Sequence, residues 1–219
     1  MPSIERSPEI EIEWEDQHVE DLVNQEPRDE QLHISDLILC LRQTTLGRQY
    51  APKWEFTTAL RFAFGRAFET ALAKTYLRNT TQELEVYLED LVGHIDFGDD
   101  PHDWECKFTW GRAPTESYLK TYWLEQAGSY AIARGRTQSR FAVFYMLPVP
   151  GVQIYVVTWT EEELEQLKSI MLNRRDYVAT HLSEGTHPPK TPLTWLCKGC
   201  AYKWICDDVE STLDLGGLE

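Results

Sequence analysis

The sequence is short of basic residues. Of its 219 residues, 21 are Lys or Arg and 36 are Asp or Glu, which gives a formal charge of −15 at pH 7. Binding to nucleic-acid phosphates normally requires a basic surface, so the total charge argues against such a partner. The acids are concentrated at the ends, however, because residues 1–30 carry −9 and residues 207–219 carry −5, and subtracting both leaves −1 for residues 31–206. We expect 1–30 to be a solvated, mobile segment, 207–219 to be an acidic tail and 31–206 to be a nearly neutral domain.

A secretory signal is also missing, because the N-terminus has no basic region followed by an apolar one. The expected location is therefore the cytoplasm, where disulfides are rare. One uncharged stretch, 141–159, is long enough to cross a membrane, but Pro148, Pro150 and Gly151 lie in its middle. This pattern instead predicts a β-hairpin whose two strands, 141–147 and 152–159, are buried on both faces. The sequence thus excludes a membrane partner.

The remaining periodicity predicts a single α/β domain, a central sheet flanked by helices. The expected elements are a helix over 36–47 with Ser35 as its N-cap, a helix over 57–78, strands over 84–90, 91–98 and 103–110, a helix over 116–134, the hairpin, and a helix over 161–182 that opens with a capping box of Thr160 and Glu163. A cysteine-rich segment follows at the C-terminus.

Two of these strands carry acidic side chains at alternating positions. In "LVGHIDFG", alternation places His94 and Asp96 on one face and Ile95 and Phe97 on the other. In "DWECKFTW", the pattern separates Glu105, Lys107 and Thr109 from Trp104, Cys106, Phe108 and Trp110. Each charged residue by itself is explained as the solvated face of a sheet. Together they predict a site with two acids and a lysine.

That combination suits phosphodiester cleavage. Carboxylates hold hard divalent cations, which activate water and neutralise charge on the phosphate. We expect Asp96 and Glu105 to be the ligands of Mg²⁺ or Mn²⁺, the backbone carbonyl of Cys106 to add an oxygen, and Lys107 to orient the nucleophile or stabilise the developing charge. Glu69, in the helix "FGRAFETAL", is placed to reach the same ion.

These motifs resemble a known superfamily. "GHIDF", followed nine positions later by "ECK", is similar to the divided acidic motif of the PD-(D/E)XK nucleases, and the element order resembles their restriction-endonuclease-like core. "QAGSY" looks like the Gln-x-x-x-Tyr motif of the RecB-like branch, which implies that Gln126 and Tyr130 lie near the metal and the DNA strand. "GRAFE" resembles the Gly-x-x-x-His motif of that branch, with Glu69 in place of the usual histidine.

Four of the five cysteines extend the resemblance. Cys197, Cys200 and Cys206 have the spacing C-x2-C-x5-C, and Cys40 lies far upstream. The pattern is similar to the CRISPR-associated RecB-like exonucleases, in which one N-terminal and three C-terminal cysteines bind an iron-sulfur cluster, here expected to be 4Fe–4S. Such a cap would join the two ends of the domain. A structural zinc site uses the same ligands and is the alternative; Cys106 is expected to be an ordinary core residue.

The resemblance implies a DNA exonuclease, with endonuclease activity as a second option. It would act on single-stranded DNA or overhangs, trim spacer precursors and cooperate with the CRISPR integrase complex. The residues expected to contact DNA are Arg42, Arg66, Tyr130 and Arg134. Two alternatives remain: a RecB-like iron-sulfur nuclease of repair, replication or viral origin, and a catalytically inactive DNA-binding scaffold.

Overall fold

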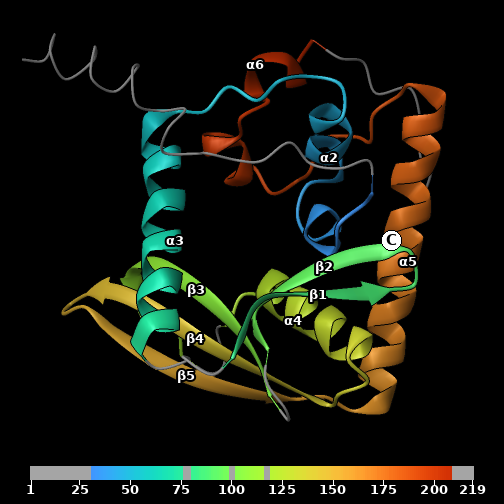
Figure 1. Ribbon diagram of the computed structural model, residues 1–219. Helices are drawn as coiled ribbons and strands as arrows, with labels where there is room; N and C mark the ends of the chain where they lie inside the picture. The colour runs from blue at the N-terminus through green and yellow to red at the C-terminus, as the bar shows by residue number, and fades with distance from the viewer. Residues whose placement is uncertain (1–30, 76–79, 99–101, 116–118, 209–219) are drawn as a thin grey trace, which may run out of the picture.

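The computed structural model describes residues 31–75, 80–98, 102–115 and 119–208 (Figure 1). The predicted acidic segment 1–30 and all but the first two residues of the tail 207–219 lie outside them. The elements, in chain order, are η1 Ile34–Leu37, α2 Leu41–Gly47, α3 Phe56–Thr75, β1 Thr81–Leu88, β2 Leu91–Gly98, β3 Asp103–Arg112, α4 Thr121–Ala133, β4 Gln138–Leu147, β5 Gly151–Thr158, α5 Glu161–Glu184, η3 Leu196–Gly199 and α6 Lys203–Cys206. The predicted α/β class is confirmed.

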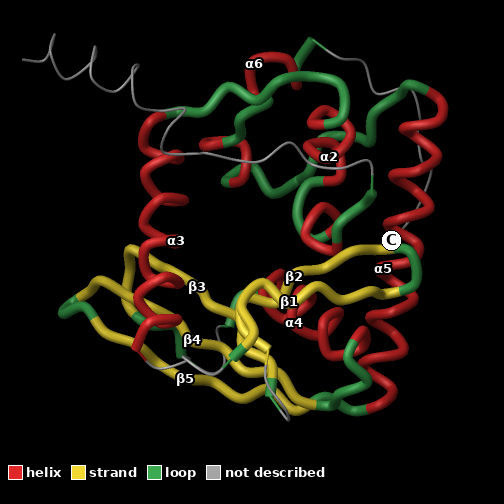
Figure 2. The backbone as a smooth tube through the Cα atoms, in the orientation of Figure 1, coloured by secondary structure: helices red, strands yellow, loops and turns green. Residues whose placement is uncertain are grey.

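The five strands form one mixed sheet in the order β1-β2-β3-β4-β5. β3 and β4 run parallel and are connected through α4, whereas the other neighbouring pairs are antiparallel. A parallel pair needs a crossover connection, which α4 supplies. Figure 2 shows the helices α3 and α5 standing at opposite sides of the molecule, with the segments that contain α2 and α6 between their upper ends.

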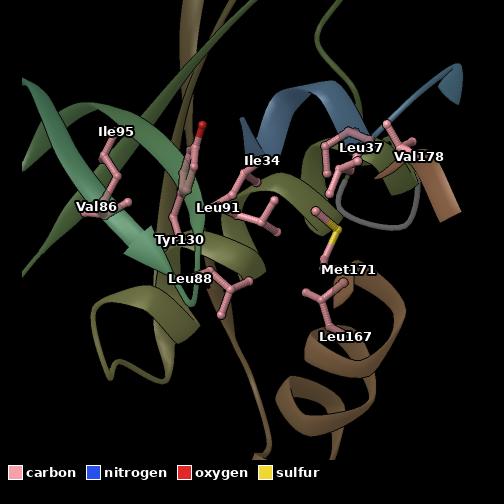
Figure 3. Packing of buried hydrophobic residues seen from close by; sticks show 11 residues of the cluster. Ile34, Leu37, Val86, Leu88, Leu91, Ile95, Tyr130, Leu167, Met171 and Val178 are labelled. Atoms are coloured by element: carbon pink, nitrogen blue, oxygen red, sulfur yellow. The ribbon is translucent and has the colours of Figure 1, made fainter. Parts of the chain in front are cut away.

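The largest apolar cluster joins η1, α4 and α5 to the sheet. Ile34 and Leu37 of η1 pack with Leu91 of β2 and with Met171 and Val178 of α5 (Figure 3). A second cluster forms between α3 and the sheet, where Leu72 and Ala73 contact residues of β2, β3 and β4. Helices thus cover the sheet from two directions, and the acidic residues of β2 and β3 lie between these clusters.

The uncharged stretch 141–159 folds as the predicted hairpin, β4 and β5. Among the described helices, none combines the length and the apolar character needed to span a bilayer. The prediction that both strands are buried on both faces is wrong for β5, because Val152, Ile154 and Val156 are exposed. β5 lies at the edge of the sheet and pairs only with β4, so it has fewer neighbours than a central strand.

The predicted helix 36–47 is wrong in its first half. The structure has the short 3₁₀ helix η1, a break at 38–40, and then α2, whose N-cap is Cys40 rather than Ser35. Asp36 explains the break: its buried carboxylate accepts a hydrogen bond from the His33 backbone N–H at 3.1 Å and pairs with Arg48 at 3.4 Å. Its carbonyl accepts a hydrogen bond from the Thr44 hydroxyl. These partners hold a turn where the sequence pattern predicts a continuous helix.

The other helices match their predictions more closely. α5 begins at Glu161 with the predicted capping box of Thr160 and Glu163, which is confirmed. α3 spans Phe56–Thr75, and the expected extension to 78 lies outside the described residues. α4 begins at Thr121 with Lys120 as N-cap; of the predicted start at 116, residues 116–118 are not described, and residues 119 and 120 are not helical.

Candidate active site

The site begins where β2 and β3 separate. Their backbones pair only at Phe97 with Trp104 and at Gly98 with Asp103, although both strands continue beyond these residues. In Figure 1 the β1-β2 hairpin turns away from β3 toward α5. The N–H of Cys106 is bonded instead to a side chain, because Asp96 Oδ2 accepts it at 2.6 Å. The carboxylate thus fills the place between the diverging strands.

The divergence also overturns a prediction about β2. Ile95 and Phe97 were expected to share a face, but Ile95 packs in the cluster of η1, α4 and α5, whereas Phe97 packs in the cluster of α3. The register of β1 skips Glu83, which has a positive φ of 49° and lies opposite Asp96. Strict alternation therefore fails at the position where the chain carries its first predicted metal ligand.

A hydrogen-bonded row connects β3 to α4. Lys107 Nζ donates to Glu105 Oε1 at 2.5 Å and to Gln126 Oε1 at 2.9 Å, and Gln126 Nε2 donates to the Tyr130 hydroxyl at 3.0 Å. Gln126 and Tyr130 are four residues apart on α4 and so lie on one helix face. The structure brings together Glu105, Lys107, Gln126 and Tyr130, all of which the sequence analysis selected.

The pKa values of the three acids at this site are raised, so their ionisation costs free energy. Burial and the nearby Asp96 raise the pKa of Glu105 to about 8, and the same two causes raise the pKa of Glu69 to about 7. Burial also raises the pKa of Asp96, although the Lys107 ammonium opposes it. Burial disfavours the charged form of Lys107, yet the Glu105 and Asp96 charges raise its pKa overall. Three desolvated carboxyl groups therefore share one ammonium.

The sequence analysis missed Glu83 of β1. Its charge raises the pKa of both Asp96 and Glu69, so this acid lies within electrostatic reach of the site even though its side chain is exposed. No spacing motif identifies it. The only available signal was its position opposite Asp96 in a hairpin whose register the sequence does not specify.

The acids of this site fit a divalent cation in one respect and not in another. Within the described residues, no group of three or more His, Cys, Asp or Glu side chains is arranged so that it could hold a metal ion. One oxygen of Glu105 and one of Asp96 are engaged by the protein donors named above. The other oxygen of Glu105, Oε2, is buried without a hydrogen-bond partner. This unsatisfied buried oxygen of Glu105 is the feature that fits a cation, which would supply the missing interaction.

The residues predicted to contact DNA have different surroundings. Arg66 is exposed on α3, and its charge lowers the pKa of Glu69. Arg134 is exposed at the end of α4 and pairs with Asp103 at 3.5 Å. Tyr130 is buried and its hydroxyl faces Gln126, so its ring is not available for stacking on a base. Of these three residues, Arg66 and Arg134 lie on the surface, where they could contact DNA, and Tyr130 does not.

The prediction that Arg42 contacts DNA does not fit its position. Its side chain is 1% exposed and donates to the carbonyl oxygens of Pro188 at 2.8 Å and Cys206 at 2.9 Å. Arg42 therefore fastens α2 to the C-terminal segment. No sequence pattern indicates this role, because a buried arginine and a surface arginine look the same in a sequence.

The four selected cysteines lie at this junction. All are partly buried free thiols. Burial raises the pKa of Cys200, and the charges of Cys40, Cys206 and Cys197 raise it further, so all three lie within electrostatic reach of it. Cys106, by contrast, packs in the core with Phe97 and Phe144, which confirms its expected role. Among the described residues these thiols do not form a group of three or more that could hold a metal ion, but Arg42 joins the segment of Cys40 to that of Cys206, which lie more than 157 residues apart in the sequence.

The family model of the PD-(D/E)XK nuclease superfamily matches residues 8–207, and the chain belongs to that superfamily. Its α/β sheet flanked by helices has the restriction-endonuclease-like fold. No curated protein sequence matches the chain significantly.

Solved structures share the fold at low sequence identity. SSO0001 has a TM-score of 0.55 and 14% identity, with 92% of this chain and 98% of that chain covered. The alkaline exonuclease LHK-Exo from Laribacter hongkongensis has a TM-score of 0.51 and 9% identity, covering 70% and 90%. A phage-related exonuclease from Haemophilus somnus 129PT has a TM-score of 0.50 and 10% identity, covering 73% and 98%. These likenesses concern the fold.

Proposed function

We propose that this protein is a Mg²⁺- or Mn²⁺-dependent DNA nuclease that removes nucleotides from single strands or single-stranded overhangs. The observation that carries the proposal is the row Glu105, Lys107, Gln126 and Tyr130 with Asp96 beside it. Membership in the nuclease superfamily supports the reaction class. The exonuclease names of two structural neighbours support the mode of attack by analogy alone.

Each residue of the site has its own role in the proposed hydrolysis. Asp96, Glu105 and the Cys106 carbonyl would hold the cation, with Glu69 approaching from α3; when bound, the ion supplies an activated water and neutralises phosphate charge. Lys107 keeps its proton, because its acidic neighbours raise its pKa, and so presents a cation to the developing negative charge. Gln126 accepts from Lys107 and fixes its direction, and Tyr130 anchors Gln126.

The test uses end-labelled single-stranded DNA with and without Mn²⁺. We expect Asp96→Ala, Glu105→Ala and Lys107→Ala to abolish cleavage while each variant still folds and unfolds in one cooperative transition. Asp176→Ala, which removes an exposed acid on α5, is the matched control and should cleave normally. Normal turnover by any of the first three variants would refute the site. A wild-type protein that binds DNA without cleaving it would favour the inactive scaffold.

The second part of the proposal is a 4Fe–4S cluster held by Cys40, Cys197, Cys200 and Cys206. The electrostatic effect of Cys40, Cys206 and Cys197 on Cys200 supports it, as does the Arg42 link between the two segments that carry these cysteines. Four thiolates also suit zinc, and metal analysis separates the two. Anaerobically purified protein should be brown and contain iron and sulfide. Colourless protein with one equivalent of zinc would overturn the cluster.

The resemblance to the CRISPR-associated RecB-like exonucleases extends the proposal to spacer precursors as substrate and the CRISPR integrase complex as partner. Only the cysteine pattern and the RecB-like motifs support this step. Co-elution with a purified CRISPR integrase on size exclusion, and trimming of overhangs on a spacer precursor in its presence, would be the expected result. Activity on overhangs with no such association would favour a repair, replication or viral role.

A further inference from the structure

One face of α3 is covered at both ends and open in the middle. Thr58, Gly65, Glu69 and Leu72 lie on this face, because their spacings of 7, 4 and 3 residues return to the same side of a helix. At the upper end a Cβ on Gly199 would meet Thr58 Oγ1 at 2.7 Å, so Thr58 touches the C-terminal segment. At the lower end Leu72 is buried in the cluster with β2, β3 and β4. Figure 1 shows that α3 runs from the C-terminal segment at its upper end to the sheet at its lower end.

Gly65 lies between the two covered ends. A Cβ built on it would have no atom of the described residues within 4 Å. Other glycines differ: a Cβ would come within 2.6 Å of the Tyr130 ring at Gly93 and within 2.5 Å of Leu167 at Gly128. Gly65 is also not among the glycines with positive φ. Neither packing nor backbone geometry therefore accounts for a glycine here, and glycine inside a helix costs about 1 kcal/mol relative to alanine.

The neighbours of Gly65 suit a nucleic-acid strand. Glu69, one turn further along α3, is coupled electrostatically to Asp96 and Glu105. Arg61, one turn before, and Arg66, next in the chain, are exposed and carry the charge that complements phosphates. Phe62 and Phe64 are 43% and 37% exposed, and exposed aromatic rings are the side chains on which unpaired bases stack.

We infer that Gly65 is a specificity-determining position for single-stranded DNA, where the missing side chain lets the strand pass against the bare helix backbone to the acids. The inference rests on the proposed nuclease function and deepens it. Glycine is the residue that permits close approach of a ligand to a backbone. A side chain at this position would occupy the clearance one turn from Glu69 and would exclude a long strand more than a short one.

The test compares Gly65→Ala and Gly65→Leu with Ala67→Leu, an exposed position two residues away that points to another side of α3. Gly65→Ala should raise the melting temperature by about 2 °C, because alanine favours the helix. Gly65→Leu should raise the KM and the Kd for a labelled single-stranded oligonucleotide about tenfold or more. Its effect on cleavage of a thymidine dinucleotide should be clearly smaller, and Ala67→Leu should match the wild type.

Each outcome is decisive for Gly65. Unchanged oligonucleotide binding by Gly65→Leu would overturn the inference, and so would equal losses on the oligonucleotide and the dinucleotide, which indicate a displaced Glu69. If Gly65→Leu folds poorly, the gain in stability and loss of affinity in Gly65→Ala give the same test. Should the wild type cleave neither substrate, the nuclease proposal fails, but anisotropy measurements of strand binding without cleavage still decide the role of Gly65.

Discussion

At the scale of single residues, the site depends on how Lys107 is held. Its ammonium has two side-chain partners, one acidic and one neutral, and the neutral partner is itself held by a buried tyrosine. Glu105 attracts the ammonium toward the carboxylates, whereas Gln126 pulls it toward α4. The position of the Lys107 ammonium is therefore set by β3, through Glu105, and by α4, through Gln126, which lies 19 residues after Lys107.

Removing the neutral partner should lower kcat and leave KM nearly unchanged. In Gln126→Ala, Lys107 loses its tether to α4, and residues that orient a catalytic group typically contribute about 10- to 100-fold. Steady-state kinetics on single-stranded DNA measure the split. Gln126→Glu, which retains an acceptor at this position, should recover part of the activity, and Tyr130→Phe should lose less than Gln126→Ala. An equal rise in KM would contradict a positioning role.

The acids also make stability depend on pH. The pKa values of Glu105 and Glu69 are raised from the ordinary 4.5 to about 8 and about 7, so the folded chain retains protons that the unfolded chain has already released. The free energy of unfolding of the metal-free protein should therefore be highest on the acid side and fall as the pH rises from 4.5 toward 8.

Urea unfolding in EDTA across this range measures the effect. Glu105→Gln, which cannot ionise, should reduce the slope, and Mn²⁺ should stabilise the wild type more at the alkaline end, because metal binding requires deprotonated ligands. Glu184→Gln, an exposed acid at the end of α5, is the control. An identical pH slope in wild type and Glu105→Gln would contradict the argument.

At the scale of elements, α2 is tied to the C-terminal segment by a buried arginine. Arg42 crosses from α2 to the carbonyls of Pro188 and Cys206, and the Lys53 N–H donates to the Ala201 carbonyl at 2.9 Å nearby. The two ends of the domain thus have protein contacts of their own, in addition to any bound metal.

Arg42→Met should lower the free energy of unfolding by about 3 kcal/mol, because it leaves two buried carbonyls without their charged donor. Urea denaturation of wild type and variant gives the difference. Arg61→Met, an exposed arginine on α3, is the matched control and should change stability by less than about 0.5 kcal/mol. If both variants lose the same amount, Arg42 does not act as a link between the two segments.

At the scale of the whole molecule, the N-terminal part of the domain contacts its C-terminal part. Residues near position 40 and near position 200 meet above the sheet (Figure 1). The helix α3 extends from this region to the sheet, where it packs against β3. A ligand bound by Cys40 together with the three C-terminal cysteines would close a loop of 157 residues, and closing a long loop removes much entropy from the unfolded chain.

Iron removal should therefore affect the entire domain and not only the visible spectrum. Cys40→Ser and Cys197→Ser should bleach the protein, lower its melting temperature and increase cleavage by trypsin after Lys190, Lys198 and Lys203 of the C-terminal segment. Cys106→Ser is the control, because it places a hydroxyl in the core without removing a proposed cluster ligand. It should lower the melting temperature, but the protein should keep its colour. Loss of colour in Cys106→Ser, or its retention in Cys40→Ser, would contradict the assignment.

Local patterns in the sequence were sufficient for much of the fold. The 91–98 strand, the hairpin turn at Pro148, Pro150 and Gly151, and the capping box at Thr160 arise from short-range periodicity and turn chemistry. The same alternation selected Glu105 and Lys107, because β3 pairs with β4 in unbroken register from Trp104 to Thr109. Alternation failed in β2, where the strand leaves its partner. The N-cap prediction at Ser35 failed because Asp36 accepts from the His33 N–H and pairs with Arg48, which together hold a turn there.

The sequence by itself determined most of the elements, and it supplied the acids, the lysine and the cysteines in family-like motifs, because these depend on residue type and spacing along the chain. Only the tertiary structure decided which of them meet. It buried Arg42, brought Glu83 toward Asp96 and left Gly65 open, because burial and electrostatic contact depend on side chains that arrive from distant parts of the chain.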